Sequence, residues 1–538
     1  MVNMIHIQRV AALLLISLSA FSYVAAAGNE PVLSSTAAKK TVLSAQREGT
    51  IKEAAAFAVP VLEAPPSDAL ANELKITEDD GRWLVSGRAL EQYGLYQTTD
   101  KQGVYRMILP AETAPTDMTE SDRNVDLMLP GKEIRNGYAV DIRHLLGPLG
   151  ISYALEGNEK RLLAFPERGR VAPVLKRQQP PAFGKAGQSV LHTVLFWDPA
   201  MAENDTVQRL DVTQPVISPC AFRMTAAGIS LRSNEMDRVD GKYSEKGYAL
   251  WPLVDNGFDP DVTHNILADP RLQEKVIKEL VGYAVLYGFH GYNLDFENIR
   301  YEDRDRLTAF VAKLAAACHG WGLNVSMDIT PLSDSKEWSL VYDRQALAPY
   351  LDYVVLMAYD QVGRTSSTAG PVASYPWVVH SVETLKALVP AEKIILGIPL
   401  YMRIWYETDA NENLPDALDK WPKTVAEAKR DRPGNAMIAP NVGTRKERKL
   451  FVRTLTLADS KKLAEKYAAY LTWDERLQLN YLELPLVTGT VKIWFEDDKT
   501  LAAKRNLAVR EGLGGVAFWR KGFEDNGFWQ GFAKHELT

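Results

Sequence analysis

The sequence feature that most constrains the fold is a regular alternation of two patterns over residues 189–535. Short apolar runs rich in β-branched and aromatic residues, such as SVLHTVLFW and GLNVSMDI, predict buried strands. Between them lie segments with apolar residues at three- and four-residue spacing, such as residues 269–289, which predict amphipathic helices. Eight strands joined mainly by helices predict parallel pairing, and this length favours a (β/α)8 TIM barrel, an α/β fold. A doubly wound open sheet is the competing prediction, but no glycine-rich phosphate loop follows the first strand.

Residues 406–497 interrupt the alternation between the seventh and eighth strands. The interruption is too long for an ordinary loop. It contains a predicted helix, LADSKKLAEKYAAYL, and a predicted strand, GTVKIWFED. We therefore predict a small α/β insertion beside the mouth of the barrel.

A separate module is predicted at residues 74–166, ahead of the barrel. GVYRMILPA alternates like a strand, YAVDIRHLLGPLGI has the spacing of a short amphipathic helix, and KRLLAF predicts a returning strand. These patterns indicate a small α+β module, joined to the barrel by the linker KRQQPPAFGKAGQ.

The N-terminus has the pattern of a signal peptide over residues 1–27. Its start, MVNMIHIQR, is positively charged, and a continuous apolar run follows. Ala25 and Ala27 form an A-x-A arrangement that predicts cleavage after Ala27, which leaves residues 28–73 as a linker. The mature protein is then expected to be exported and soluble, with no membrane contact. The alternative is an uncleaved membrane anchor, for which the apolar run is short.

Composition and spacing exclude several classes of partner and site. The chain has 62 basic and 68 acidic residues, a net charge of −6 and no strong basic patch, so nucleic acid is not an expected partner. Cys220 and Cys318 are too far apart for a metal signature, and we expect packed free thiols, although an exported location would permit a bridge. HTVLFWDP and VDNGFDPDVTH hold scattered His and Asp at spacings that loops supply by chance. We predict no metal and no cofactor, and no pattern indicates an oligomeric state.

The stretch GYNLDFE, residues 291–297, carries polar side chains on one face of a predicted buried strand. Because side chains alternate along a strand, one set points outward under the helices and the other points into the barrel. The inward set is Asn293, Asp295 and Glu297. Glu297 then lies at the C-terminal rim, where barrel enzymes hold their active sites. The alternative is a strand with one solvated face, which the helical patterns on both sides disfavour.

Asp295 and Glu297 form a carboxylate pair. Two residues apart on a strand, their Cα atoms are ~6–7 Å apart, so each carboxylate raises the free energy of ionising the other. Such a pair can keep one carboxyl protonated near neutral pH. A carboxyl poised to donate a proton is what cleavage of a glycosidic bond requires.

GYNLDFE resembles the fourth-strand signature of glycoside hydrolase family 18, the chitinase-like barrels, which has the form D-G-x-D-x-D-x-E. Three further stretches, MAYD, GIPLYMRIW and GGVAFW, follow in the family's order. They are similar to M-x-Y-D of the sixth strand, G-x-P-x-Y-x-R of the seventh and G-G-x-x-x-W of the eighth. The resemblance covers roughly residues 189–535, and the D-F-E-N ending together with Asn293 is similar to the bacterial spore-germination and cell-wall branch.

The resemblance implies substrate-assisted catalysis with retained configuration, a departure from the usual two-carboxylate scheme. Glu297 would be the acid/base, Asp295 would orient the 2-acetamido group whose carbonyl oxygen attacks C1, and Tyr359 would hydrogen-bond that group. The implied substrate-binding residues are Trp519 as an apolar floor, Asp360, Met357 and Asn293 in the same subsite, and Tyr401 and Arg403 at the rim. The alternatives are that Trp519 is barrel core, that Met357 only packs, and that Arg403 pairs with an acid of the insertion.

Two positions depart from the family pattern, with His290 at the first aspartate and Asn293 at the second. Asparagine can hydrogen-bond Asp295 but cannot ionise, so we expect an altered pH dependence with activity retained. The resemblance implies an exported glycosidase that acts beside N-acetylglucosamine, in peptidoglycan, a related glycan or chitin. The alternatives are a lectin-like glycan-binding protein on the same barrel and an envelope assembly protein that uses residues 74–166.

Overall fold

The computed structural model describes residues 72–98, 103–109, 119–145, 151–156, 161–166, 191–200, 207–232, 243–431 and 449–529, with short gaps inside these ranges. The chain divides into two units, Met1–Val61 and Leu62–Thr538, and all described residues belong to the second. The predicted signal peptide and nearly all of the predicted linker that follows it lie outside the described residues.

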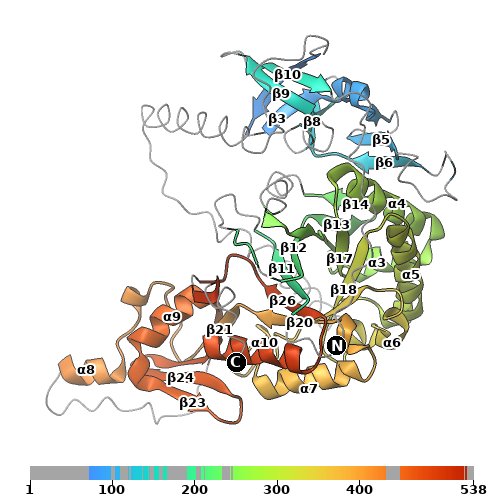
Figure 1. Cartoon of the computed structure of the whole chain (residues 1–538). Helices are drawn as coiled ribbons and strands as arrows, with labels where there is room; N and C mark the ends of the chain where they lie inside the picture. Colours follow the sequence, from blue (N-terminus) through green and yellow to red (C-terminus); the bar gives the residue numbers. More distant parts are fainter. Residues whose placement is uncertain are drawn as a thin grey trace, which may run out of the picture. The chain divides into compact units, whose positions relative to one another are not determined.

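The second unit contains a closed barrel of parallel strands, as predicted (Figure 1). β17 (Gly291–Asp295) pairs with β16 (Leu253–Asp255) on one side and β18 (Asn324–Ile329) on the other. Pairing continues through β19 and β20 to β26, which also pairs with β11, and β11 pairs with β12. The third strand, whose two parts pair with β12 and with β17, completes the ring. The remaining bounds are β11 (Thr193–Asp198), β12 (Gln214–Pro219), β19 (Tyr353–Leu356), β20 (Ile394–Pro399) and β26 (Gly515–Trp519).

The third strand of the barrel is interrupted. Its first part, β15 (Ala249–Leu250), pairs with β12, whereas β16 pairs with β13 (Phe222–Thr225). β13 forms a hairpin with β14 (Gly228–Leu231), so the sheet continues beyond β16. This continuation brings Arg223 into register with Asp255 at the C-terminal end of β16.

Helices cover the outside of the barrel, and Figure 1 shows α3, α4 and α5 alongside β17 and β18. α4 (Pro270–Tyr287) begins after Asp269, whose side chain accepts the N–H of Arg271, and ends at Gly288, which has a φ of 67°. Glycine adopts this left-handed conformation without a Cβ clash, so the helix stops and the chain turns toward β17. The other barrel helices are α3 (Pro260–Ala268), α5 (Arg304–Gly320), α6 (Arg344–Leu347), α7 (Tyr375–Lys386) and α10 (Asp498–Arg510).

Two further observations concern burial and membranes. Cys220 and Cys318 are buried and are not joined by a disulfide bond, as expected from the sequence. Within the part of the chain that the structure describes, no helix combines the length and apolar character needed to cross a bilayer.

The predicted insertion is a five-stranded antiparallel sheet between β20 and α10. It begins at β21 (Tyr401–Thr408), so Tyr401 and Arg403 belong to its first strand. The predicted helix and strand are present as α9 (Leu457–Lys466) and β25 (Gly489–Phe495). The other elements are β22 (Lys449–Thr456), β23 (Leu471–Asp474), β24 (Leu479–Leu486) and α8 (Val425–Asp431).

The module ahead of the barrel consists mainly of small antiparallel sheets. GVYRMILPA and KRLLAF contain β5 (Val104–Ile108) and β10 (Arg161–Pro166), as predicted. The helix predicted for YAVDIRHLLGPLGI is wrong at its start, because β8 (Gly137–Asp141) is a strand between β3 and β7. Ala139, Val140 and Asp141 are all buried there, and a central strand with two hydrogen-bonded neighbours accommodates that run without a helical apolar face. The other bounds are β1 (Asn72–Lys75), β2 (Thr77–Asp79), β3 (Arg82–Ser86), β4 (Tyr96–Gln97), β6 (Asn124–Met128), β7 (Gly131–Ile134) and β9 (Ile151–Glu156).

Candidate active site

Three aspartates lie side by side at the C-terminal ends of neighbouring barrel strands. Asp255 at the end of β16 is in register with Asp295 at the end of β17. The register of β17 with β18 places Asp328 next to Asp295 on the other side. Each of the three is less than a tenth exposed. We call Asp255, Asp295 and Asp328 the aspartate row.

Asp255 is paired with arginines, whereas Asp295, in the middle of the row, has no such partner for one of its oxygens. Asp255 accepts hydrogen bonds from Arg223 at 2.5 and 3.1 Å and from Arg232 at 2.9 Å. Oδ1 of Asp295 is buried and has no hydrogen-bond partner among the described residues. A buried acceptor without a donor destabilises the fold, so this atom marks a place where a bound ligand could supply an N–H or O–H.

Glu297 follows β17, and Asn256 fixes its backbone. Asn256 Nδ2 donates to the carbonyl oxygen of Glu297 at 2.8 Å, and the Glu297 N–H donates to Asn256 Oδ1 at 3.1 Å. The side chain of Glu297 is half-buried and hydrogen-bonds the carboxyl group of Asp295. The two acids therefore meet at the C-terminal rim of the barrel, as the alternation of GYNLDFE predicts.

Burial and mutual repulsion raise the pKa values of both acids. Burial raises the pKa of Asp295 to about 7, the negative charge of Asp255 adds to the rise, and the hydrogen bond with Glu297 opposes it. The pKa of Glu297 lies well above its ordinary value, first because of burial and then because of the charge of Asp295. Burial therefore favours the protonated form of Glu297, the form that a general acid needs.

Asn293 supports this site from inside the barrel and is fully buried. Its Oδ1 accepts hydrogen bonds from Trp197 Nε1 at 2.7 Å and Ser218 Oγ at 3.3 Å. Its Nδ2 donates to Ser326 Oγ at 3.1 Å and to Asp328 Oδ1 at 2.8 Å. The four partners use both ends of the amide, so Asn293 links β17 to β11, β12 and β18. The bond to Asp295 that we considered is not among them.

Tyr359 and Trp519 lie against one buried ring, that of Trp197. Tyr359, which follows β19, meets the Trp197 ring edge-on with centroids 6.2 Å apart. Trp519, at the end of β26, lies 5.8 Å from the same ring. Tyr359 and Trp519 remain partly exposed, whereas Trp197 is fully buried. Burial raises the pKa of Tyr359 well above its ordinary value, so its hydroxyl stays a hydrogen-bond donor.

The rim beside Tyr359 is fixed by an ion pair between the barrel and the insertion. Asp360 accepts hydrogen bonds from Arg403 Nη2 at 2.5 Å and from the hydroxyl of Tyr401. Half of the Asp360 side chain is exposed, whereas Arg403 is buried. Arg403 thus pairs with an acid of the barrel and not with one of the insertion. Met357 is buried at 8% exposure, which agrees with a packing role.

Sequence patterns missed several residues of this site. Trp197 lies in HTVLFWDP, and Asp255 and Asn256 lie in VDNGFDPDVTH, the two stretches whose scattered His and Asp we attributed to chance spacing. Both stretches nevertheless hold residues that bond to or pair with Asn293, Asp295 or Glu297. Asp328 was missed as well, although the inward positions of NVSMDI follow the same alternation as those of GYNLDFE.

His290 lies just before β17, away from the rim. Its Nδ1 accepts the backbone N–H of Leu250 at 3.2 Å, and burial lowers its pKa. This agrees with its interpretation as a strand-start residue. In the described residues, no group of three or more His, Cys, Asp or Glu side chains is arranged to hold a metal ion.

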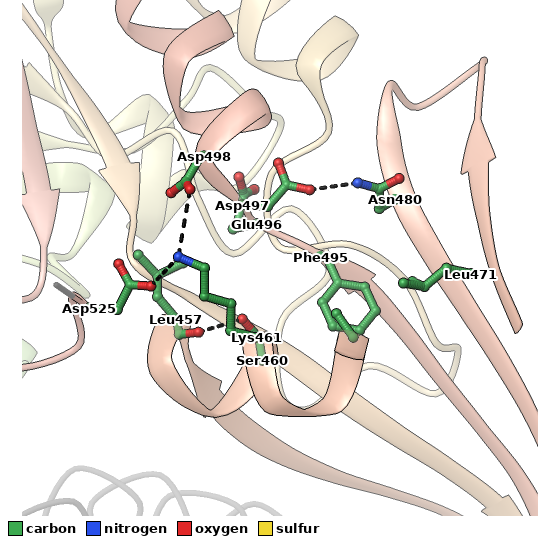
Figure 2. Close-up of a pocket in the computed structure, with 11 residues that line it drawn as sticks. Leu457, Ser460, Lys461, Leu471, Asn480, Phe495, Glu496, Asp497, Asp498 and Asp525 are labelled. Atoms are coloured by element: carbon green, nitrogen blue, oxygen red, sulfur yellow. Dashed lines mark hydrogen bonds and ion pairs between the residues drawn. The ribbon is translucent and has the colours of Figure 1, made fainter. Parts of the chain in front are cut away.

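A cavity of about 90 Å³ lies between the insertion and the start of α10, and Figure 2 shows its lining. Residues of α9, of β25 and of the start of α10 contribute to this lining. Lys461 points toward Asp525, at 2.6 Å, and Asp498, at 3.6 Å. The aspartate row and Glu297 are not part of this lining, so the cavity is distinct from the carboxylate site.

Comparisons with known proteins agree with this geometry. Residues 263–524 match the family model described as glycosyl hydrolases family 18. The uncharacterized glycosylase YvbX of Bacillus subtilis is 23% identical over 299 residues, which cover 54% of this chain and 76% of that protein. The cortical fragment-lytic enzyme of Bacillus anthracis is 26% identical over 278 residues, and a class V chitinase of Arabidopsis thaliana is 25% identical over 289 residues. These matches cover 50% and 49% of this chain and 55% and 65% of the two relatives, so less than two thirds of either relative is spanned.

A solved structure shares the fold. The C-terminal domain of a proposed chitinase from Desulfitobacterium hafniense DCB-2 superimposes with a TM-score of 0.52 at 21% identity, covering 65% of this chain and 100% of that domain. The four motifs, the carboxyl pair at the barrel rim and the match over residues 263–524 lead to one conclusion. Residues 263–524 form a domain that matches glycosyl hydrolases family 18.

Proposed function

We propose that the chain is an exported retaining glycosidase that hydrolyses linkages beside N-acetylglucosamine by substrate-assisted catalysis, with peptidoglycan or a related glycan as its substrate. The observation that carries the proposal is the buried, unpartnered Oδ1 of Asp295 next to the carboxyl of Glu297, whose pKa burial raises well above its ordinary value. The N–H of a 2-acetamido group would satisfy that oxygen. A sugar held in this way would present its linkage oxygen to Glu297.

The first half of the reaction uses both acids and the amide of the substrate. Asp295 accepts the acetamido N–H and directs the acetamido carbonyl oxygen toward C1. Glu297 donates its proton to the glycosidic oxygen as the C1–O bond breaks, and the acetamido oxygen forms the new bond to C1. The product is an oxazolinium ion, whose positive charge is stabilised by the Asp295 carboxylate.

The second half regenerates the acid. The Glu297 carboxylate takes a proton from a water molecule, and the water oxygen attacks C1 and reopens the ring. Two successive displacements at C1 retain its configuration. Tyr359 supports both halves because its hydroxyl can donate to the acetamido carbonyl oxygen as charge develops there. Trp519 supplies an apolar surface for the sugar ring.

The choice of glycan is supported by the names of the relatives. Those called cortical fragment-lytic enzymes favour a bacterial wall glycan, and those called chitinases keep chitin as the competing substrate. Both polymers contain the acetamido group that the mechanism needs.

Replacement of Glu297 with glutamine tests the mechanism. We expect Glu297→Gln to lower the release of new reducing ends from peptidoglycan or chitin oligomers by ~100-fold or more, because general acid catalysis contributes about that much. Asp352→Asn is the control, since Asp352 precedes β19 at the opposite end of the barrel and its carboxylate accepts the N–H of Val325. Unchanged turnover by Glu297→Gln would exclude Glu297 from the mechanism. Glycan binding by the wild type without any product in mass spectrometry would favour the lectin-like alternative.

Two further measurements address substrate and export. N-deacetylated substrates are expected to resist cleavage, because they lack the carbonyl oxygen that attacks C1. Secreted protein is expected to begin at Gly28, which N-terminal sequencing detects. Recovery of the protein only inside cells, with residues 1–27 intact, would contradict export.

A further inference from the structure

Asp328 is a buried acid that the proposed mechanism does not yet use. It ends the inward face of β18 at 1% exposure, next to Asp295 in the sheet register. Its carboxylate accepts hydrogen bonds from Asn293 Nδ2 at 2.8 Å and from Trp197 Nε1 at 3.2 Å. Both donors are neutral side chains. The buried acid is therefore held in place by two N–H groups and has an acidic neighbour on the adjacent strand.

Asn293 connects Asp328 to the strand that carries Asp295. It stands on β17 two residues before Asp295 and has no ionisable group, so β17 itself supplies no second carboxyl below Asp295. Asn293 instead uses its amide to hold Asp328 against β17. Neighbouring strands of a sheet are roughly 5 Å apart, a distance at which two buried carboxylates repel strongly. The carboxylate that repels Asp295 therefore comes from Asp328 on the adjacent strand, β18, and not from β17 itself.

We infer that Asp328 is a positioning residue of the hydrolysis, whose carboxylate controls through Asp295 which carboxyl group at the barrel rim holds a proton. The inference rests on the proposed function. Asp328 touches neither the sugar nor the linkage oxygen in this scheme. It acts through Asp295 and Glu297, and a negative charge on Asp328 makes the loss of a proton from either one less favourable.

The groups around Asp328 are consistent with this role. Burial raises the pKa of Asp328 well above its ordinary value, Asp295 raises it further, and the bonds from Asn293 and Trp197 oppose the rise. In return, Asp328 contributes to the raised pKa of Glu297. The other titratable groups that face this cluster are Asp255 from β16, Tyr342 from the segment before α6, and Tyr359 and Asp360 after β19.

The test is the pH profile of kcat/KM for three variants on one substrate. Asp328→Asn removes the charge and keeps the shape, and we expect the alkaline limb, which reports Glu297, to move to lower pH by roughly half a unit or more. Asn293→Asp combined with Asp328→Asn returns one carboxyl to the cluster on β17, and we expect the limb to move back toward the wild-type position. Asp352→Asn, at the other end of the barrel, is expected to leave the profile unchanged.

Each other outcome counts against the inference. An unchanged alkaline limb in Asp328→Asn, a lower kcat without a shift, or an equal shift in Asp352→Asn would show a structural role only. If Asp328→Asn does not fold, Asp328→Ser keeps an oxygen acceptor for the two N–H groups, and the same limb shift is expected. Failure of this inference is separable from failure of the proposed function, because Glu297→Gln tests the latter without involving Asp328.

Discussion

Asp295 destabilises the folded protein above acidic pH, and replacing it with asparagine should reverse the effect. Its pKa is about 7 in the folded protein, against 3.8 for an ordinary aspartate. Each pKa unit corresponds to about 1.4 kcal/mol, so a difference of about 3 units gives at most about 4 kcal/mol. We expect Asp295→Asn to gain about 1–3 kcal/mol in the free energy of unfolding, because relaxation around a buried charge reduces the penalty.

The sign of the pH dependence follows from proton binding. Below the unfolded-state pKa near 3.8, Asp295 is protonated in both states and does not affect stability. Between that pH and about 7 the unfolded chain releases the proton while the folded protein keeps it, so stability falls as pH rises. Above about 7 both states are ionised, and the loss is complete. The advantage of Asp295→Asn should therefore grow across this window.

Urea unfolding followed by tryptophan fluorescence measures the effect, at about pH 4 and about pH 8. The wild type and Asp295→Asn should differ little at the lower pH, and the variant should be more stable at the higher pH. Activity should fall in the same variant, since an amide cannot balance the oxazolinium charge. Asp352→Asn serves as the control and should show no gain that increases with pH. Equal stability of Asp295→Asn and the wild type at about pH 8 would refute the assignment of a buried, costly charge to Asp295.

Three other substitutions have defined outcomes. A Cβ on Gly397 would lie 2.6 Å from a carbonyl oxygen of β19 and 3.2 Å from the ring of Tyr359. Gly397→Ala should therefore displace Tyr359 and lower kcat/KM at least about tenfold. Gly363→Ala is the control, because a Cβ there would meet open space, and it should not lower kcat/KM. Tyr359→Phe should lower kcat by roughly 100-fold with little change in KM, and an equal rise in KM would contradict its role in the transition state. Lys504→Met leaves its buried carboxylate partner unpaired and should cost about 3–5 kcal/mol in urea unfolding, while Lys461→Met, in a half-exposed pair, should cost about 1 kcal/mol or less. Similar losses for the two lysine variants would contradict the burial argument.

The barrel and the pair of acids could be predicted because both depend on local periodicity. An alternation of period two places Asp295 and Glu297 on the inward face of their strand, whatever the neighbouring strands are. The C-terminal ends of parallel strands meet at one rim, so motifs containing Tyr359 and Trp519 are brought together by topology alone. The structure places all four around the same mouth.

The aspartate row could not be predicted in the same way, because it depends on register between strands. A single Asp255 at the end of a short strand resembles a loop residue until β16 is aligned with β17. Asp328 has the same inward alternation as Asn293 and Asp295, but its neighbour is known only once the barrel is closed. The helix predicted for residues 138–151 is wrong at its start for a related reason, since β8 pairs on one side with β3, which is distant in sequence.

The three acids of the aspartate row differ in how many hydrogen-bond donors stabilise their buried carboxyl groups. Asp255 is neutralised by two arginines, and Asp328 is held by two N–H donors. Asp295 lies between them and has an oxygen without a donor. A barrel selected only for stability would place an apolar residue at this position, because one uncompensated acid between two others raises the free energy of the folded state. Asp295 is the member of the row that both hydrogen-bonds Glu297 and has an oxygen without a donor, and a bound acetamido group would satisfy that oxygen.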